Sequence, residues 1–311
     1  MKTHKKLLLC IVGPTASGKS ALAMQLCALL NGEIVSCDSM QIYRGCDIAT
    51  SKPTRHEQNL VPHHLIDICE PNQRFSAAQW AAQAAKCCAE IESRDRVPIL
   101  CGGTGFWLRA LLQPEVLSAV PPNPELRKQL QAELETSGAA AMHEKLSALD
   151  AGAAARLHPN DAFRVVRALE IALGEKPEST KNEVLKESDY DAQIFALDWP
   201  REMLYARINT RVDAMLEAGF EAELRALRNH WGNDAPALGG VGYQQMLPVL
   251  DDPSRFEEGV ETWKRDTRRY AKRQITWFAH QLPVSWLSAE GELSELAAQI
   301  AKSYKFDGAA V

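Results

Sequence analysis

The first 116 residues alternate between apolar runs and amphipathic stretches, which is typical of strands separated by helices. Apolar runs predict strands at 7–12, 33–37, 61–68 and 97–101, and helical periodicity predicts helices at 18–30 and 76–92. Strands that alternate with helices in this way pair in parallel, and the helices cover the sheet. We therefore expect an α/β fold with a parallel sheet at its centre.

Alanine-rich helical patterns follow the prolines at 121–124. They predict helices at 124–137, 139–148 and 160–173, the last capped by Asn160 or Asp161 and ended by Gly174. Residues 176–191 are polar and predict a loop. A strand at 193–198 and helices near 201–217, 219–230, 240–250, 254–281 and 290–303 complete the pattern. The simplest division is an α/β core made of 1–116 and 193–311, interrupted by a helical insertion at 117–192.

The composition is that of a globular protein. The 311 residues are 46% hydrophobic and 24% charged, and no apolar stretch reaches the roughly 18 to 20 residues that a bilayer requires. The N-terminus leads into the first predicted strand without the pattern of a cleavage site. We therefore expect a cytoplasmic protein with no membrane partner, and we expect it to be a monomer.

Cysteine and histidine usage indicates structural roles. All eight cysteines precede residue 102 and none forms a CxxC pair, which favours reduced, buried thiols over disulfides or zinc. His63 and His64 are adjacent, and adjacent side chains rarely bind one metal ion, so we expect them to be structural.

A glycine-rich segment directly follows the first predicted strand. It reads Gly13, Pro14, Thr15, Ala16, Ser17, Gly18, Lys19 and Ser20. The glycines let backbone N–H groups converge on a phosphate, and the helix that follows adds the positive end of its dipole. Lys19 adds a full charge, and Ser20 offers a hydroxyl to Mg²⁺. The segment predicts a phosphate-binding loop with Mg²⁺ as cofactor, but it does not reveal which phosphates are held.

Two other strand ends carry candidate chemistry, because functional residues of parallel sheets lie beyond the carboxyl ends of the strands. Asp38 follows the second predicted strand, where a carboxylate can bind Mg²⁺ through water, accept a proton from an attacking group, or only cap a helix. Cys101 ends another strand and is followed by Gly102-Gly103-Thr104-Gly105. The glycines would let a ligand approach the backbone closely, or the segment could simply be a turn between a strand and a helix.

Charge is distributed unevenly along the chain. The net charge of −5 argues against a protein that coats nucleic acid indiscriminately. Between Trp263 and Gln281, however, six basic residues accompany one acidic residue. At helical spacing a basic ridge forms from Arg265, Arg268, Arg269, Lys272 and Arg273, interleaved with Tyr270, Trp277 and Phe278. Such a ridge could bind the phosphates of a nucleic acid while its aromatic residues stack on the bases. Equally, it could be an ordinary solvent-exposed helix face whose aromatic residues point into the core.

Seven segments, in order along nearly the whole chain, closely resemble the tRNA dimethylallyltransferase family of bacterial type. They are GPTASGKS at 13–20, DSMQIYRGCDIATSKP at 38–53, PHHLIDI at 62–68, GGTGFWLRAL at 102–111, RLHPNDAFRVVRALE at 156–170, VGY at 241–243 and RRYAKRQITWF at 268–278. The resemblance implies a P-loop NTPase-like core. It also implies transfer of a dimethylallyl group from dimethylallyl diphosphate to N6 of adenosine 37, just 3′ of the tRNA anticodon, with release of diphosphate.

The resemblance further implies roles for individual residues. Asp38 would be the general base, and Thr104 and Arg211 would complete the catalytic set, with Arg211 supporting the diphosphate that residues 13–20 hold. The implied tRNA contacts are Asp38, Ser39, Met40, Gln41, Thr104, Arg127, Phe163, Arg164, Val165, Val166, Arg167, Val241, Gly242, Tyr243, Lys272, Arg273, Gln274 and Trp277. The helical insertion would contact the anticodon arm.

Some positions depart from the family pattern, and other functions stay open. Phe163 stands where many relatives carry a polar residue, and VGY lacks the basic residues that often flank it. A small-molecule or nucleoside kinase would use the same loop and Asp38 with ATP as donor. An adenylate isopentenyltransferase acting on free AMP and a non-catalytic RNA-binding protein are further alternatives. The insertion and the basic ridge favour tRNA.

Overall fold

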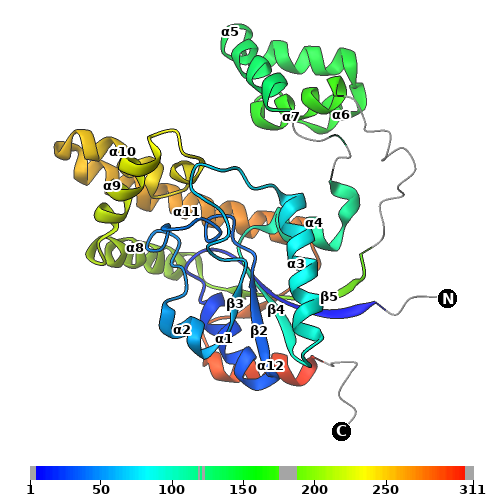
Figure 1. Cartoon of the computed structure of the whole chain (residues 1–311), viewed down its shortest axis with the longest axis vertical. Coiled ribbons are helices and arrows are strands. Elements are labelled where there is room, and N and C mark those ends of the chain that lie inside the picture. Colours follow the sequence, from blue (N-terminus) through cyan, green and yellow to red (C-terminus); the bar gives the residue numbers. More distant parts are fainter. Residues whose placement is uncertain (1–4, 118–119, 121–122, 175–187, 305–311) are drawn as a thin grey trace. The chain divides into compact units, whose positions relative to one another are not determined.

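The computed structural model describes residues 5–117, 120, 123–174 and 188–304 (Figure 1). The chain divides into two compact units, which we call the core unit (Met1–Gln113 with Ser188–Val311) and the helical unit (Pro114–Glu187). The predicted loop at 176–191 lies largely outside the described residues, as do two of the prolines at 121–124.

A six-stranded sheet forms the centre of the core unit, and every strand pairing is parallel. The strands are β1 (Lys6–Val12), β2 (Gly32–Ser36), β3 (His63–His64), β4 (Val97–Gly102), β5 (Tyr190–Asp198) and β6 (Val284–Ser288), in the order β3-β2-β4-β1-β5-β6. Residues 8–12 of β1 are fully buried, as expected for a strand covered on both faces. Parallel pairing brings the carboxyl ends of all strands to one edge, which confirms the predicted fold class.

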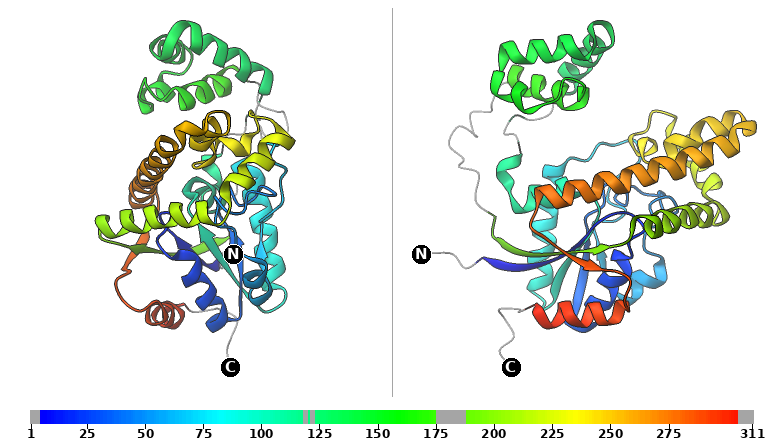
Figure 2. Two further views of the ribbon diagram at one scale, coloured as in Figure 1. Left: turned by 90° about the vertical axis from the view of Figure 1, so that its left-hand side faces the viewer. Right: turned by 180° about the vertical axis from the view of Figure 1, so that it is seen from behind.

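Nine α-helices accompany this sheet among the described residues of the core unit. They are α1 (Lys19–Leu30), α2 (Arg55–Leu60), α3 (Ala77–Glu92), α4 (Gly105–Leu112), α8 (Arg201–Glu217), α9 (Phe220–Trp231), α10 (Tyr243–Asp251), α11 (Phe256–Gln281) and α12 (Leu293–Ser303). Helix α1 packs against α12, α3 against α4, and α8 against α11, which is the long orange helix in Figure 2. No helix in the described ranges is long and apolar enough to cross a membrane.

The helical unit has a core of its own. Its helices are α5 (Pro124–Leu149), α6 (Ala151–Arg156) and α7 (Ala162–Leu173). Their apolar faces meet in a cluster of Leu130, Met142, Leu146, Ala154, Val165, Val166 and Leu169. Gly138 has non-helical angles (φ 80°) inside α5, which confirms the break predicted between 137 and 139. Asp161 caps α7 by accepting from the N–H of Arg164 at 3.3 Å.

The strand predicted at 61–68 is wrong in length, because only His63–His64 pair with β2. Leu65 and Asp67 adopt left-handed φ angles of 61° and 55°, which no strand contains. Strand β6 and helices α2 and α6 were not predicted, since each is only five or six residues long.

The predicted roles of cysteine and histidine are consistent with the structure. All eight cysteines are free, and seven of them are buried. His63 contacts the carbonyl of Val61 at 2.8 Å and His64 contacts Glu33 at 2.6 Å, so both rings serve the fold.

Candidate active site at the carboxyl ends of the strands

The glycine-rich loop connects β1 to α1 in the geometry of a phosphate cradle. Gly13 and Gly18 have φ angles of 123° and 97°, which side chains disfavour. Lys19 opens α1, and its Nζ returns to the carbonyl of Pro14 at 3.3 Å. Burial lowers the pKa of Lys19, so an anion bound in the loop would favour its charged form.

Two side chains hold the loop from outside. The indole of Trp199 donates to the carbonyl of Ser17 at 2.8 Å, and Arg207 donates to the carbonyl of Ala16 at 2.9 Å. The Arg207 guanidinium lies 4.4 Å from the centre of the Trp199 ring. Because the carbonyl and N–H of a trans peptide point in opposite directions, these contacts turn the N–H groups of Ser17 and Gly18 toward the inside of the loop.

Asp38 and Thr104 are brought together by the pairing of β2 with β4. The N–H of Thr104 donates to the carbonyl of Cys37 at 3.1 Å, and the Thr104 hydroxyl accepts from the N–H of Ser39 at 2.9 Å. A Cβ added to Gly102 would lie 2.0 Å from the carbonyl oxygen of Cys37, so this approach requires glycine. The Thr104 side chain thus fixes the backbone immediately after Asp38.

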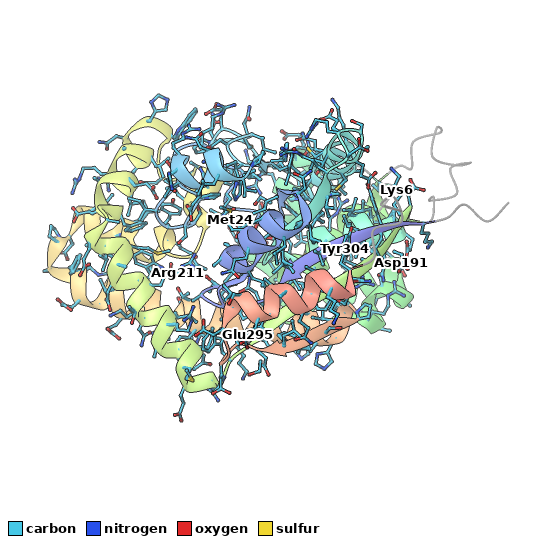
Figure 3. All side chains as sticks on the ribbon, turned by 90° about the horizontal axis from the view of Figure 1, so that it is seen from below. Lys6, Met24, Asp191, Arg211, Glu295 and Tyr304 are labelled. Carbon is cyan, nitrogen blue, oxygen red and sulfur yellow. The ribbon has the colours of Figure 1, made fainter. Side chains whose placement is uncertain are left out.

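These strand ends open into one cavity of about 1110 Å³ within the core unit. Its walls include Lys19 and Ser20 from the loop, Asp38 after β2, Arg211 from α8 and Tyr270 from α11. Figure 3 locates Arg211 on α8 beside α1, which carries Met24, and both residues line the cavity. Burial lowers the pKa of Arg211, and the charge of Asp38 opposes that effect. The cavity therefore combines cationic groups with carboxylates, and among the latter Asp38 lies at the end of β2.

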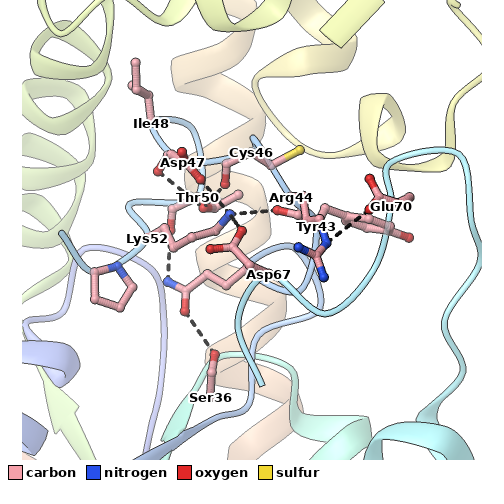
Figure 4. A network of polar contacts seen from close by, with 12 residues as sticks. Ser36, Tyr43, Arg44, Cys46, Asp47, Ile48, Thr50, Lys52, Asp67 and Glu70 are labelled. Atoms are coloured by element: carbon pink, nitrogen blue, oxygen red, sulfur yellow. Dashed lines mark hydrogen bonds and ion pairs between the residues drawn. The ribbon is translucent and has the colours of Figure 1, made fainter. Parts of the chain in front are cut away.

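The segment after Asp38 is locked by the buried ammonium of Lys52 (Figure 4). Its Nζ lies 2.6 Å from Asp47 Oδ1, 2.6 Å from Asp67 Oδ1 and 2.7 Å from the carbonyl of Tyr43. Sequence reasoning named none of these residues as functional. No local pattern marks Lys52 as buried, because its immediate neighbours in the run at 38–53, a serine and a proline, are typical of an exposed turn.

The Gln41 amide is also used within this segment. It donates to the carbonyls of Thr50 and Ser51 at 3.2 and 3.3 Å and accepts from the hydroxyl of Ser36 at 3.0 Å. Ser39, Met40 and Gln41 all line the cavity and are partly exposed, but of the three only the Gln41 side chain is bound to the carbonyls of this segment.

Glu223 on α9 holds the same segment from the other side. Its carboxylate accepts from the N–H groups of Asp47 and Ile48 at 2.8 and 2.7 Å and from the Tyr243 hydroxyl at 2.6 Å. Tyr243 is fully buried and Gly242 is buried beside it, whereas Val241 lines the cavity. No local pattern predicts a role for Glu223, because its backbone partners Asp47 and Ile48 lie more than 170 residues away in sequence.

Helix α11 separates its charged and apolar residues. Arg265, Arg269, Lys272 and Arg273 of the basic ridge are exposed, and Arg268 is half-buried and donates to Asn209 at 2.7 Å. Phe278 and Gln274 are buried beneath the ridge, while Tyr270 and Trp277 are half-buried. The ridge is thus a solvent-facing cationic surface over an aromatic underside.

The predicted RNA contacts of the helical unit divide into two groups. Phe163 is 79% exposed and Arg164 is exposed beside it, paired with Asp161 at 2.6 Å. The side chains of Val165 and Val166 lie in the core, away from solvent. Arg127 and Arg167 are half-buried, and both pair with the fully buried Glu170, at 2.6 and 2.9 Å.

A family model and curated relatives match this chain over most of its length. A family model described as IPP transferase matches residues 41–281. The tRNA dimethylallyltransferase of Anaeromyxobacter dehalogenans is 44% identical over 297 residues, covering 95% of this chain and 99% of that protein. The tRNA dimethylallyltransferase of Halalkalibacterium halodurans is 42% identical, covering 91% of each chain.

Solved structures agree with these sequence matches. The full-length tRNA isopentenylpyrophosphate transferase of Bacillus halodurans superposes with a TM-score of 0.71 at 40% identity, covering 96% of this chain and 95% of that one. A eukaryotic dimethylallyltransferase acting on tRNA superposes with a TM-score of 0.78 at 28% identity, covering 96% of this chain and 77% of that one.

Proposed function

The chain belongs to the tRNA dimethylallyltransferase family of prenyl-transferring enzymes, and from this premise we propose that its cavity transfers the dimethylallyl group of dimethylallyl diphosphate to N6 of adenosine 37 in tRNA. The observation that carries the proposal is the single cavity that joins the phosphate cradle, Arg211 and Asp38. A leaving diphosphate and an attacking amine require this combination of cations and a base.

The loop suits a diphosphate. Gly18, Lys19 and Ser20 of the loop all line the cavity, so a diphosphate bound there would lie against the N-terminus of α1 and the Lys19 ammonium. The Ser20 hydroxyl, in the first turn of α1, would ligate Mg²⁺, which when bound supplies further neutralisation of the leaving group. Thr15, also on the cavity wall, would contact the diphosphate.

The chemistry follows from these positions. The allylic C–O bond breaks, and its electron pair leaves with the diphosphate, whose charge Lys19 and Arg211 stabilise. A C–N bond forms from the adenine N6, and the amine proton passes to the Asp38 carboxylate. Thr104, through Ser39, keeps Asp38 directed at the amine.

The acceptor base must leave the anticodon loop to enter the cavity, and an unpaired loop base costs least to extrude. We propose that Ser39 and Met40 meet the extruded base. Lys272 and Arg273, exposed on α11, would bind phosphates of the same RNA. Phe163 and Arg164 would contact the anticodon arm from the helical unit.

The test is a donor comparison. Unmodified tRNA is incubated with Mg²⁺ and either dimethylallyl diphosphate or ATP, digested to nucleosides and analysed by mass spectrometry. We expect adenosine that carries one dimethylallyl group, and only with the prenyl donor. Phosphorylated product with ATP would favour a kinase, and a parallel reaction in which free AMP is prenylated more efficiently than tRNA would favour an adenylate isopentenyltransferase.

A further inference from the structure

Gln274 is a buried polar residue on the helix that carries the basic ridge. Its side chain is 6% exposed, whereas its neighbours Lys272 and Arg273 are exposed. A buried amide requires partners for both its oxygen and its nitrogen. The residue therefore has a role in the interior that its sequence position, within a cationic run, does not suggest.

The partners of Gln274 belong to the two halves of the active site. Its Oε1 accepts from the N–H of Thr15 in the phosphate loop at 2.9 Å. Its Nε2 donates to the carbonyl of Gly103, in the turn after β4, at 2.9 Å. Because one partner is a donor and the other an acceptor, the orientation of the amide is determined by the backbone around it.

The turn after β4 is shaped to receive this side chain. A Cβ added to Gly103 would lie 2.2 Å from Gln274 Nε2, and a Cβ added to Gly105 would lie 2.2 Å from the Trp277 ring. Thr104, between the two glycines, holds the N–H of Ser39. A continuous series of contacts thus runs from the phosphate loop through Gln274 to the backbone that carries Asp38.

We propose that Gln274 is a positioning residue that fixes the phosphate loop relative to the Asp38 side of the cavity, and that it is not an RNA contact. The inference rests on the proposed transfer reaction. There the diphosphate and the amine lie on opposite sides of the allylic carbon, and the attacking nitrogen must approach within about 3 to 3.5 Å. A shift of the loop by about 1 Å would misalign donor and base without changing the surface that meets RNA.

The primary variant is Gln274→Met, which keeps the length and helical preference of the side chain and removes both hydrogen bonds. We expect kcat to fall about 10- to 100-fold, as for a misplacement of about 1 Å, while KM for tRNA stays within about twofold. Lys272→Met, on the exposed face, should give the opposite split, with a raised KM for tRNA and a retained kcat. Gln299→Met removes an exposed glutamine of α12 and should change neither value.

A second variant approaches the same contact from the other partner. Gly103→Ala would push the end of the Gln274 side chain away, and we expect the same selective fall in kcat. If Gln274→Met does not fold, as judged by circular dichroism, the kcat and the KM for tRNA of Gly103→Ala test the inference instead.

Each result has a separate meaning. A raised KM for tRNA with normal kcat in Gln274→Met would make Gln274 an RNA contact, and normal values for both would remove any role in the reaction; either overturns the inference. Wild-type enzyme that fails to prenylate tRNA would instead overturn the proposed function.

Discussion

Asp38 is the residue on which the proposed chemistry depends most. Replacing it with asparagine preserves its shape and its bond to the N–H of Met40 at 2.9 Å, but removes the base. Because general base catalysis contributes on the order of 10² to 10⁴ in rate, we expect kcat to fall by that factor. Binding of tRNA should stay within about twofold. Single-turnover prenylation and filter binding measure the two quantities.

Asp191→Asn is a matched control for this variant. Asp191 is an exposed carboxylate near the beginning of β5, at the edge of the sheet opposite the cavity. The Asp191→Asn variant should prenylate tRNA at the wild-type rate. If Asp38→Asn also turned over at nearly that rate, another group would have to accept the proton.

Local sequence patterns predict the parts of the site that local structure builds. The phosphate loop and Asp38 each follow a strand that periodicity identifies, and the structure places both on one cavity wall. The orientations of Gln274 and Tyr243 could not be predicted in this way, because their partners lie 259, 171 and 20 residues away. The sequence of a motif is the same whether its glutamine or tyrosine side chain points into the interior or toward solvent.

At the scale of elements, the basic ridge of α11 yields a prediction about salt. Arg269 and Arg273 are exposed, and neutralising both with alanine should weaken tRNA binding. Each lost phosphate contact should reduce the slope of log K against log salt by about one unit, through counterion release. Titrations at several salt concentrations give the slope.

Lys302→Ala on α12 is the control for this experiment, because the residue is exposed on a helix that packs against α1. It should leave the slope unchanged. An unchanged slope in the double arginine variant as well would mean that the ridge is only a solvated face.

Helix α7 carries a buried carboxylate that stabilises the helical unit. Burial acts to raise the pKa of Glu170, but hydrogen bonds from Arg167, Arg127 and the N–H of Asn123 outweigh it and hold the pKa below its ordinary value. A lowered pKa means that the stabilisation is complete above the unfolded pKa of about 4.3 and is lost as pH falls through the folded value. Thermal unfolding at pH 7 and at successively lower pH below about 4 measures this loss.

Glu170→Gln should remove that pH dependence and destabilise the helical unit by about 3 kcal/mol at pH 7, since it breaks a buried ion pair on one side. Glu144→Gln, an exposed carboxylate of α5, is the control. If Glu170→Gln kept the wild-type loss of stability at low pH, other carboxylates would be responsible.

Element prediction succeeded where periodicity was long. Helices α8, α9 and α11 span 12 to 26 residues and begin and end within about two residues of their predicted bounds. Strand β3 was overestimated because Leu65, Ile66 and Ile68 are apolar. Asp67 between them instead pairs with Lys52, and the backbone there leaves the ladder. An apolar run indicates that residues are buried, but it does not show whether their backbone pairs with a neighbouring strand. Errors in strand length are therefore expected.

At the scale of the whole molecule, the order of the strands depends on contacts that no local pattern records. Strand β5 lies beside β1, pairing Tyr190 with Lys6, although the entire helical unit separates it from β4 in sequence. The pattern does reveal that strand periodicity stops after 101 and returns near 193, which is why the insertion could be predicted while the strand order could not.

The two units have separate cores, so we expect two transitions in calorimetry. Glu170→Gln should lower only one of them and thereby assign it to the helical unit. Diphosphate at about 100 times its Kd should stabilise the core unit by about 2.7 kcal/mol, which raises its transition by roughly 5 to 10 °C. The transition of the helical unit should not move, because the phosphate loop lies entirely in the core unit.

Addition of tRNA distinguishes the proposed roles of the two units. If RNA contacts both the ridge of α11 and the exposed Phe163 and Arg164, it should raise both transitions, since a ligand stabilises each folded unit that it binds. Phe163→Ala with Arg164→Ala should then abolish the shift of the helical unit and leave that of the core unit. A tRNA effect confined to the core transition in the wild-type protein would mean that the insertion does not contact the anticodon arm.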